Sequence, residues 1–567
     1  MTHWIPRPQP YGKAGMLTDL NAGLTLGILL IPQAMAYGML AGVGPVFGLY
    51  AAIIPMLVYG LLASTPHVSV GPTALASLLC LSGLSDLATP GTPEYLNYAF
   101  VLAGLTGVLQ LIFGILRLGG IVSLLSRPVL SGFVSAAAIL IVVSQLDALF
   151  GIATESSDYF HQTIISLIKG MGQVHLPTAI LGVGALFAMV ASRRWLPKHF
   201  PFTLFVIIAT TLLVWLFGAD WQVVTVGEVP AGLPALAFPE VDLPLLRQLF
   251  PIALVMALIS FIETLSIGKA FSPKYDYYRI SPNREAIALG LSKIIGAIFQ
   301  AVPTSASFSR SAVVEEGNGK TAASNLVAVL LLLLVLLFFT SPFYYLPIPV
   351  LAAVIIYSVR NLFDLAEMRR LGMLAPKELL TLLITFFFTL FAGLEYGIAG
   401  GVVLSLIFVF WRAARPHLAE LGRIPNTNAF RNVQRFSQAE ADPSVLIVRF
   451  DAELYFGNAE YFRNQLERLV IARGDQLKTV IIDGHTINDI DTTGLFELSR
   501  FVETLAQKNI ALYLCGMIGP VRDKLFKSGL MQQIGTGHQC LSIQSAILHL
   551  ENQSDDQGWD GPAVQHD

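Results

Sequence analysis

The sequence predicts a polytopic α-helical membrane protein that carries a small soluble α/β domain at its C-terminal end. Of the 567 residues, 54% are hydrophobic and only 13% are charged, whereas soluble domains carry about 25% charged residues. The mean hydropathy is +0.65. The run from Ala323 to Thr340 has no charge, and a helix needs about 20 apolar residues to cross the hydrocarbon core. Charges become frequent only past Arg415, where the soluble part is expected to begin.

Apolar runs between Pro, Gly and charged breaks predict about fourteen membrane spans. The expected spans are 20–39, 43–63, 69–86, 97–116, 128–147, 176–192, 200–217, 248–270, 284–301, 306–317, 322–341, 344–358, 377–393 and 395–411. Two of them, 69–86 and 306–317, are short for a bilayer span, and each begins after a proline or a run of small hydroxyl residues.

Basic residues gather in alternate loops, around 117–127, 193–198, 269–284 and 360–377, while the intervening loops are acidic. Loops rich in Lys and Arg face the cytoplasm. We therefore expect a multi-pass protein of the cell (plasma) membrane with both termini cytoplasmic. Residues 1–19 are expected to form a cytoplasmic N-terminal segment and residues 20–415 the transmembrane domain.

The C-terminal part reads as alternating strands and amphipathic helices. Strands are expected at 445–450, 477–484 and 510–517, and helices at 459–472 and 493–509. This alternation is typical of a small α/β domain with a mainly parallel sheet. We assign residues 416–435 to a linker, 436–552 to the domain and the polar residues 553–567 to a disordered tail.

Several function classes lack support in the sequence. The net charge is -3, which gives nucleic-acid binding no electrostatic support. The cysteines, Cys80, Cys515 and Cys540, have neither metal spacing nor the pattern of a disulfide framework. The chain contains no Walker loop, catalytic triad or zinc spacing. We therefore expect neither an enzyme nor a bound cofactor.

The two short segments predict a binding site for a small anion. "SVGPTALAS" (69–77) and "VPTSASFSRS" (302–311) each place proline and small hydroxyl residues before a short helix. Helix N-termini expose free N–H groups and a positive dipole end, and interrupted helices in corresponding halves of a transporter point to a midplane site. Ordinary packing of small residues between helices is the alternative. The expected contacts come from Pro72, Thr73, Ala74, Ser307, Phe308 and Ser309.

Arg310 and Glu263 are the two charged residues that stand out within the predicted spans. Arg310 would add a full charge and planar donors that match an oxyanion. A membrane-embedded arginine is costly and usually functional, although at the inner interface it would only be a snorkelling charge. Glu263 lies in mid-span with no Lys or Arg within a turn. It is a candidate proton carrier, or a sodium ligand together with Thr264, Thr304 or Ser305; its alternative role is a structural partner for Arg310.

Several segments in series resemble the sulfate permease (SulP) anion transporter family. They are "IPQAMAYGMLAGVGPVFGLYAA" (31–52), "SRPVLSGFVSAAAILIVVSQL" (126–146) and the whole of 261–321. The resemblance ends with a STAS domain, carried by "FDAELYFGNAEYF" (450–462) and "DIDTTGL" (489–495). At Ser64, Thr65 and Pro66 the sequence departs from the small-Ser-basic end of the family signature.

The resemblance implies a fold of seven plus seven spans in an inverted repeat, similar to the nucleobase transporters. A core domain of spans 1–4 and 8–11 would move against a gate domain of spans 5–7 and 12–14. It implies a secondary active transporter of small oxyanions such as sulfate, working by an elevator-like motion and coupled to protons. It further implies that Gln33, Met35 and Tyr37 line the substrate cavity, that Ser309 and Arg310 lie on the anion-binding segment, and that the protein forms a homodimer.

Three alternatives stay open at this point. The chain could be a sodium–bicarbonate or C4-dicarboxylate symporter of the same family, in which case Na⁺ replaces H⁺ as the coupling ion. It could also be a membrane-anchored STAS signalling receptor that transports nothing. In the STAS domain, Thr492 and Thr493 match a loop that is phosphorylated in related bacterial regulators, and a cytoplasmic protein could bind there. A hydroxyl at a helix start is also an ordinary N-cap.

Overall fold

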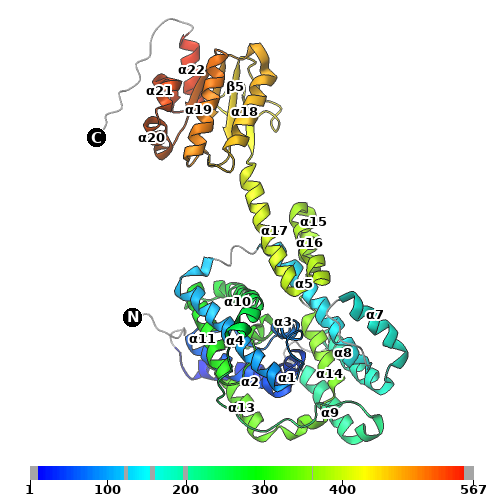
Figure 1. The fold of residues 1–567 in the computed structure, drawn as a ribbon. Helices are drawn as coiled ribbons and strands as arrows, with labels where there is room; N and C mark the ends of the chain where they lie inside the picture. The colour runs from blue at the N-terminus through cyan, green and yellow to red at the C-terminus, as the bar shows by residue number, and fades with distance from the viewer. Residues whose placement is uncertain (1–10, 121–125, 153–159, 196–201, 361, 554–567) are drawn as a thin grey trace. The chain divides into compact units, whose positions relative to one another are not determined.

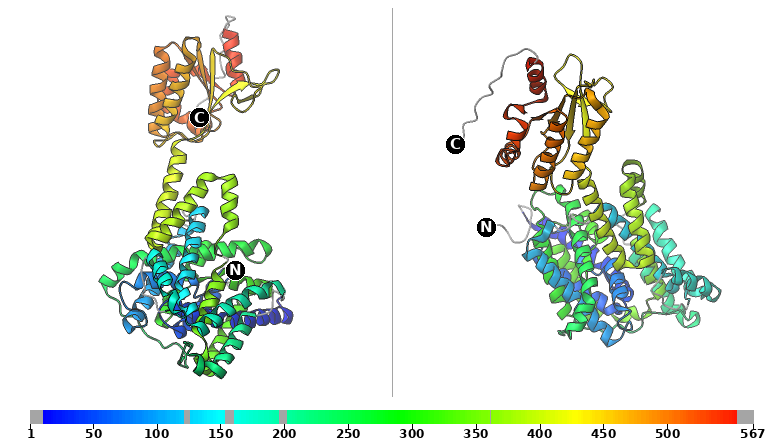
Figure 2. Two further views of the ribbon diagram at one scale, coloured as in Figure 1. Left: turned by 90° about the vertical axis from the view of Figure 1, so that its right-hand side faces the viewer. Right: turned by 45° about the horizontal axis from the view of Figure 1, so that its top comes forward.

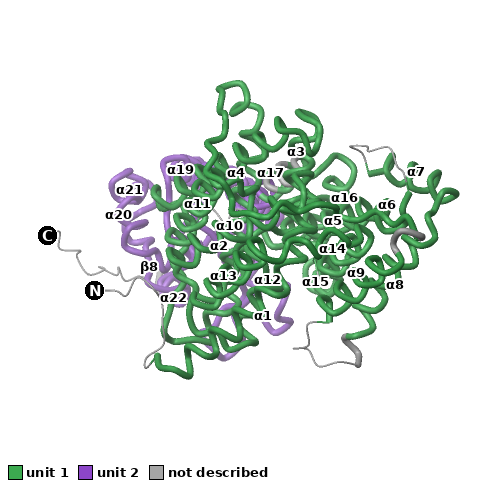
Figure 3. The backbone as a smooth tube through the Cα atoms, turned by 90° about the horizontal axis from the view of Figure 1, so that it is seen from below, with its two compact units in different colours: residues 1–405 green, residues 406–567 purple. Residues whose placement is uncertain are grey.

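The structure is a computed structural model and describes residues 11–120, 126–152, 160–195, 202–360 and 362–553. The chain divides into two compact units, residues 1–405 and 406–567 (Figure 3). The boundary falls inside one long helix, α17 (Leu394–Ala414). The expected tail from residue 554 onward lies outside the described residues.

Unit 1 is built of helices (Figure 1). In the first half they are α1 (Lys13–Leu40), α2 (Pro45–Leu62), α3 (Ala74–Leu84), α4 (Pro93–Ile115), α5 (Arg127–Ser144), α6 (Leu146–Phe150), α7 (Phe160–Gly170), α8 (Leu176–Trp195) and α9 (Phe202–Trp221). In the second half they are α10 (Leu243–Phe271), α11 (Pro282–Ile298), α12 (Phe308–Glu316), α13 (Ala323–Phe338), α14 (Ile348–Val359), α15 (Leu365–Leu374), α16 (Pro376–Ala392) and α17.

In the described part of the chain, a helix stands at the place of every expected span. Five helices are long and apolar enough to cross a bilayer by themselves, and α7 with α8, bent by 119°, forms one further candidate. Shorter apolar helices, among them α3, α13 and α14, account for most of the rest. Helices α7 and α15 were not predicted, and α1 begins at Lys13, inside the segment expected to precede the membrane domain.

The helices begin where the sequence supplies caps. Thr92 accepts a hydrogen bond from the N–H of Tyr95 at the start of α4, and Asp242 accepts one from the N–H of Leu245 at the start of α10. Such caps satisfy N–H groups that have no partner within the helix. Pro93 follows the Thr92 cap directly, a position where its missing N–H costs nothing.

Unit 1 contains two groups of mutually packed helices. In one group α1 packs on α13, α10 on α4, α4 on α11 and α13 on α2; in the other, α5 packs on α16 and α8 on α14. The contact of α1 with α13 corresponds to that of α10 with α4, the contact of α4 with α11 to that of α13 with α2, and the contact of α5 with α16 to that of α14 with α8. This correspondence is consistent with a repeat of seven plus seven spans. At the α4–α11 contact, a side chain on Gly107 would meet the carbonyl oxygen of Gly290 at 2.7 Å, so only glycine permits this close approach.

Unit 2 contains a six-stranded sheet in the order β4-β3-β5-β6-β7-β8. The strands are β3 (Leu418–Arg423), β4 (Phe430–Asn432), β5 (Val445–Phe450), β6 (Thr479–Asp483), β7 (Ala511–Cys515) and β8 (Gln539–Cys540), and the helices α18 (Ala459–Arg473), α19 (Thr492–Gln507), α20 (Gly519–Lys527), α21 (Leu530–Ile534) and α22 (Ile543–Gln553). Strands β5 to β8 are parallel, as predicted. Helices α18 and α19 lie side by side on one face (Figures 1 and 2), and α22 covers the other.

The expected linker at 416–435 differs in the structure. Strands β3 and β4 lie within it, and β3 pairs antiparallel with β5. The sheet therefore begins at Leu418 instead of after residue 435. The strand signal in "LAELGR" was missed because charged residues interrupt a short run, while burial of Ala419 and Leu421 against the α22 face holds it in place.

Candidate functional site

Two very short strands bring the two halves of unit 1 together. Strand β1 (Val70–Gly71) pairs antiparallel with β2 (Ser305–Ala306), with Val70 opposite Ala306 and Gly71 opposite Ser305. Each strand leads directly into a short helix, β1 into α3 and β2 into α12. The predicted pair of interrupted helices is therefore present, and the starts of both helices meet at one strand pair.

The two helix starts are built alike. Thr73 caps α3 by accepting from the N–H of Ala76 at 3.3 Å, and Ser307 caps α12 by accepting from the N–H of Arg310 at 3.4 Å. Beyond each cap, the N–H groups of the first two helical residues have no acceptor within their own helix. Ala74 begins one helix and Phe308 the other. Backbone donors and two positive dipole ends thus converge on the same place.

Arg310 lies at this strand pair and is almost fully buried, with 2% of its surface exposed. Its Nη1 donates to the carbonyl oxygen of Pro72 at 2.8 Å, which joins α12 to the segment before α3. Among the described residues, its Nε and Nη2 have no acceptor. A side chain on Gly71 would meet Nη2 at 3.4 Å, so the glycine leaves room for the guanidinium. A buried cation with two unused donors can hold an oxyanion.

Glu263, on α10, accepts a hydrogen bond from the hydroxyl of Ser305. It lines a small cavity together with Ser260, Thr304 and Ser305. The hydroxyls of Thr304 and Thr106, which also line this cavity, have no hydrogen-bond partner among the described residues. A carboxylate beside unused hydroxyl oxygens can take up a proton, a water molecule or a small hard cation.

The other predicted site residues divide between those near this cluster and those turned away from it. The side chains of Phe308 and Ser309 are exposed, and the Phe308 ring stacks on Phe271 at 5.7 Å, so these residues offer backbone rather than side-chain groups. Thr264 donates to the carbonyl of Ser260 in its own helix and is not among the residues that line the cavity. Its predicted role as an ion ligand gains no support.

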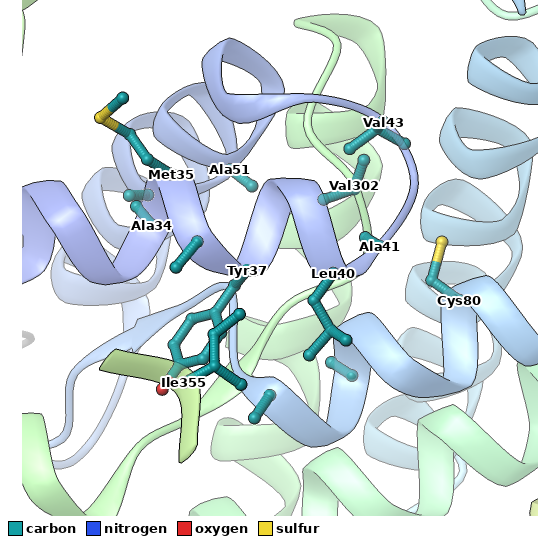
Figure 4. Close-up of a cluster of buried hydrophobic side chains, with 14 of the residues drawn as sticks. Ala34, Met35, Tyr37, Leu40, Ala41, Val43, Ala51, Cys80, Val302 and Ile355 are labelled. Carbon is teal, nitrogen blue, oxygen red and sulfur yellow. The ribbon is translucent and has the colours of Figure 1, made fainter. Parts of the chain in front are cut away.

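On α1, Gln33 is half-buried and Met35 is buried. Tyr37 is 6% exposed and lies among buried apolar side chains, Ile355 of α14 among them (Figure 4). Their role in lining the substrate cavity stays a prediction.

Sequence reasoning missed Lys293, a buried lysine on α11 that is 1% exposed. Its ammonium donates to the Oε1 of Gln110 at 2.8 Å. Gln110 in turn bonds between helices, because its Nε2 donates to the carbonyl of Ala257 on α10 at 2.9 Å. A lysine in the middle of a predicted span was the available signal, and it was passed over.

Two buried carboxylates were also missed, and both hold loops. Asp19 accepts from the N–H groups of Lys320 and Thr321 at 2.5 and 3.1 Å, which fixes the turn after α12. Glu285 accepts from the N–H of Ser64 and from the hydroxyl of Tyr59, which fixes the segment before β1. Glu285 thus holds the chain that leads into β1, and Asp19 holds the chain that leaves α12.

In unit 2, helix α19 begins at Thr492 and its cap is Asp491, which accepts from the N–H of Gly494 at 2.7 Å. The capping role considered for the threonines therefore belongs to the aspartate. Within this unit, Thr492 is exposed and Thr493 half-buried.

Comparison with known families identifies the family and the C-terminal domain. The model of the sulfate permease family matches residues 16–385, more than half of the chain. The chain belongs to the sulfate permease family. A STAS domain model matches residues 437–546, close to the predicted domain. The predicted family and the fold class of a polytopic helical membrane protein with a C-terminal STAS domain are confirmed.

This sulfate permease family member is similar to named relatives and to a solved structure over nearly its whole length. It is 33% identical to the chloroplastic sulfate transporter 4.1 of Arabidopsis thaliana, over 93% of this chain and 79% of the relative. It is 31% identical to a Mycobacterium tuberculosis protein named as a probable sulfate transporter, over 96% and 97% of the two chains.

Among solved structures, murine Solute Carrier 26 family member A9, an anion transporter in the inward-facing state, matches with a TM-score of 0.86 at 24% identity, over 95% of this chain and 92% of that chain. The transmembrane domain of a cyanobacterial bicarbonate transporter matches with a TM-score of 0.61 at 22% identity, over 71% and 99%. At such sequence identities, these two structures support the fold alone.

Proposed function

We propose that this protein is a secondary active transporter that moves a sulfate-type oxyanion across the cell membrane and couples its movement to protons. The anion binds at the β1–β2 strand pair, between the N-termini of α3 and α12. The names of the curated relatives, which are sulfate transporters, support the substrate class.

The observation that carries the proposal is the guanidinium of Arg310. It is buried, it is held by one hydrogen bond to Pro72, and its Nε and Nη2 have no acceptor in the described part of the chain. Leaving buried charged donors without partners costs free energy. An oxyanion would satisfy both donors, and the converging helix starts would add N–H groups and favourable dipoles.

Glu263 is our candidate for the coupling group. It lines the cavity beside β2, and its bond to Ser305 connects it with the strand that leads to Arg310. Protonation of this carboxylate would remove a negative charge beside the anion site. Anion and proton would then bind in mutual support, which is the thermodynamic requirement for symport.

The helix packing supports an elevator-like mechanism. The group that contains α1 to α4 and α10 to α13 would be the core that carries the site, and the group that contains α5, α8, α14 and α16 would belong to the gate. We further propose cytoplasmic termini, a homodimer, and regulation through the STAS domain at Thr492 or by a protein that binds there.

A sodium-coupled transporter, with bicarbonate or a dicarboxylate as its substrate, is the second candidate. The specific observation in its favour is that two hydroxyls in the cavity of Glu263, those of Thr106 and Thr304, have no partner in the part of the chain that the structure describes. Together with the carboxylate they offer the oxygen ligands that a hard cation prefers.

The test is uptake of labelled sulfate into proteoliposomes, with pH and sodium gradients imposed separately. Bicarbonate, fumarate and sulfate serve as competitors. The proposal predicts that an inward proton gradient drives accumulation and that unlabelled sulfate competes best. Accumulation that requires sodium would favour the second candidate, and no uptake of any anion would favour a membrane-anchored STAS receptor.

A further inference from the structure

A second buried cation lies next to the cavity of Glu263. The ammonium of Lys293 donates to Gln110 Oε1 at 2.8 Å and to Ser260 Oγ at 3.3 Å. Both acceptors are neutral, and the residue is 1% exposed. A lysine at such a position is expensive to bury and is expected to have a function.

The surroundings of Lys293 are arranged to receive a donor. Gln110 uses its amide nitrogen to donate to the carbonyl of Ala257 and to Ser260 Oγ, so its carbonyl oxygen is turned toward the lysine. Ser260 Oγ thus receives hydrogen bonds from both residues. Ser260 also lines the cavity that contains Glu263 and Ser305. The lysine is therefore one side chain removed from the proposed coupling site.

The charges around the strand pair can be counted. When protonated, Arg310 and Lys293 contribute two positive charges, and Glu263 contributes one negative charge when ionised and none when protonated. With Glu263 protonated, the sum is plus two, which a dianion such as sulfate neutralises. Without Lys293 the same state would carry plus one, which a monoanion neutralises. Uncompensated charge is costly in a low-dielectric site.

We propose that Lys293 is a specificity-determining residue that sets the preferred charge of the transported anion at minus two. This inference rests on the proposed function. Lys293 does not touch the anion. It acts on the anion through its electric field, across Ser260 and the cavity. The contribution of a unit charge grows with the charge of the anion, so the lysine favours a dianion over a monoanion of the same shape.

The test compares two tetrahedral oxyanions that differ in charge, sulfate and perchlorate. Binding to the purified full chain is measured by competition with labelled sulfate at one pH and ionic strength. The wild type should prefer sulfate. Lys293→Gln and Lys293→Met should reduce the ratio of the two affinities by about tenfold, on the order of the effect of one unit charge at a partly buried site. Lys293→Arg should keep the ratio within about threefold of wild type because it preserves the charge.

A second variant neutralises the positive charge of Lys293 and leaves the lysine itself in place. Gln110→Glu would place a carboxylate at the atom that now accepts from Lys293 and would neutralise the ammonium in place. It should lower the ratio as Lys293→Gln does. This variant keeps the test decisive if the lysine variants fail to fold.

Three results would overturn the inference about Lys293. They are a wild type that binds perchlorate as tightly as sulfate, neutral variants that weaken both anions equally, and a Gln110→Glu variant with an unchanged ratio. If the wild type binds no labelled sulfate at all, the proposed function itself fails, which is distinct from failure of the lysine's role.

Discussion

Arg310→Ala is the substitution that most sharply probes the proposed anion site. It removes a buried guanidinium whose Nη1 is bonded to Pro72 and whose Nε and Nη2 are unpartnered among the described residues. An anion on these two donors would gain charge-assisted hydrogen bonds. Their loss should weaken sulfate binding by about 1–3 kcal/mol, or roughly 5- to 150-fold in Kd. Arg310→Lys should recover only part of this loss, since lysine keeps the charge but not the planar fork.

The assay is equilibrium binding of labelled sulfate to purified protein in detergent, with monodispersity and thermal unfolding measured in parallel. Removing Arg310 also frees the carbonyl of Pro72, so some loss of thermal stability is expected. Arg284→Ala is a matched control, because the Nε of Arg284 also donates to a backbone carbonyl, that of Leu62, at 2.8 Å. It should leave the Kd for sulfate near the wild-type value. Unchanged sulfate affinity in a well-folded Arg310→Ala protein would refute the assignment of Arg310 to the anion site.

Three further outcomes are expected. Glu263→Gln should abolish sulfate accumulation driven by a pH gradient while sulfate binding stays close to wild type, since the amide keeps the size but cannot titrate. If this variant accumulates sulfate as well as the wild type does, Glu263 has no role as a proton carrier. Ending the chain at Ala414 should leave the Kd for sulfate unchanged, and lost binding in a folded truncation would show that unit 2 helps to form the site. In unit 2, burial works to raise the pKa of Asp451, but hydrogen bonds from Arg449 and His417 outweigh it and lower the pKa. The stability gained is therefore present above about pH 4 and is lost as the pH falls through the folded-state pKa. In isolated 416–553, the difference in unfolding temperature between wild type and Asp451→Asn should therefore shrink in acid. A difference that stays constant with pH would contradict this.

Much of the helical framework could be predicted because the bilayer imposes a minimum length of apolar chain on each span. The short segments before Ala74 and Phe308 were likewise visible as proline and hydroxyl residues interrupting apolar runs. The pairing of the two segments through strands β1 and β2 could not be predicted. Strands of two residues carry no periodicity, and nothing in the local sequence of Val70 reveals that Ala306 lies opposite.

Side-chain partners were harder to predict than elements. Ser305 was grouped with Glu263 as a possible ion ligand, and its hydroxyl does donate to that carboxylate. Thr264 was placed in the same group but bonds back to its own helix, a choice that depends on which face of α10 meets the cavity. The acceptors of Lys293 could not be predicted because they lie on two other helices, α4 and α10. A buried charge on an apolar helix is visible in sequence, whereas its partners are decided by tertiary packing.

Locating a bound anion tests the central claim most directly. Selenate resembles sulfate in shape and charge, and its selenium can be located by anomalous diffraction from crystals of the full chain. We predict a single strong peak at the β1–β2 strand pair, within hydrogen-bonding distance of Arg310 and of the first N–H groups of α3 and α12. A peak elsewhere in the transmembrane domain, with this place empty at saturating selenate, would contradict the account.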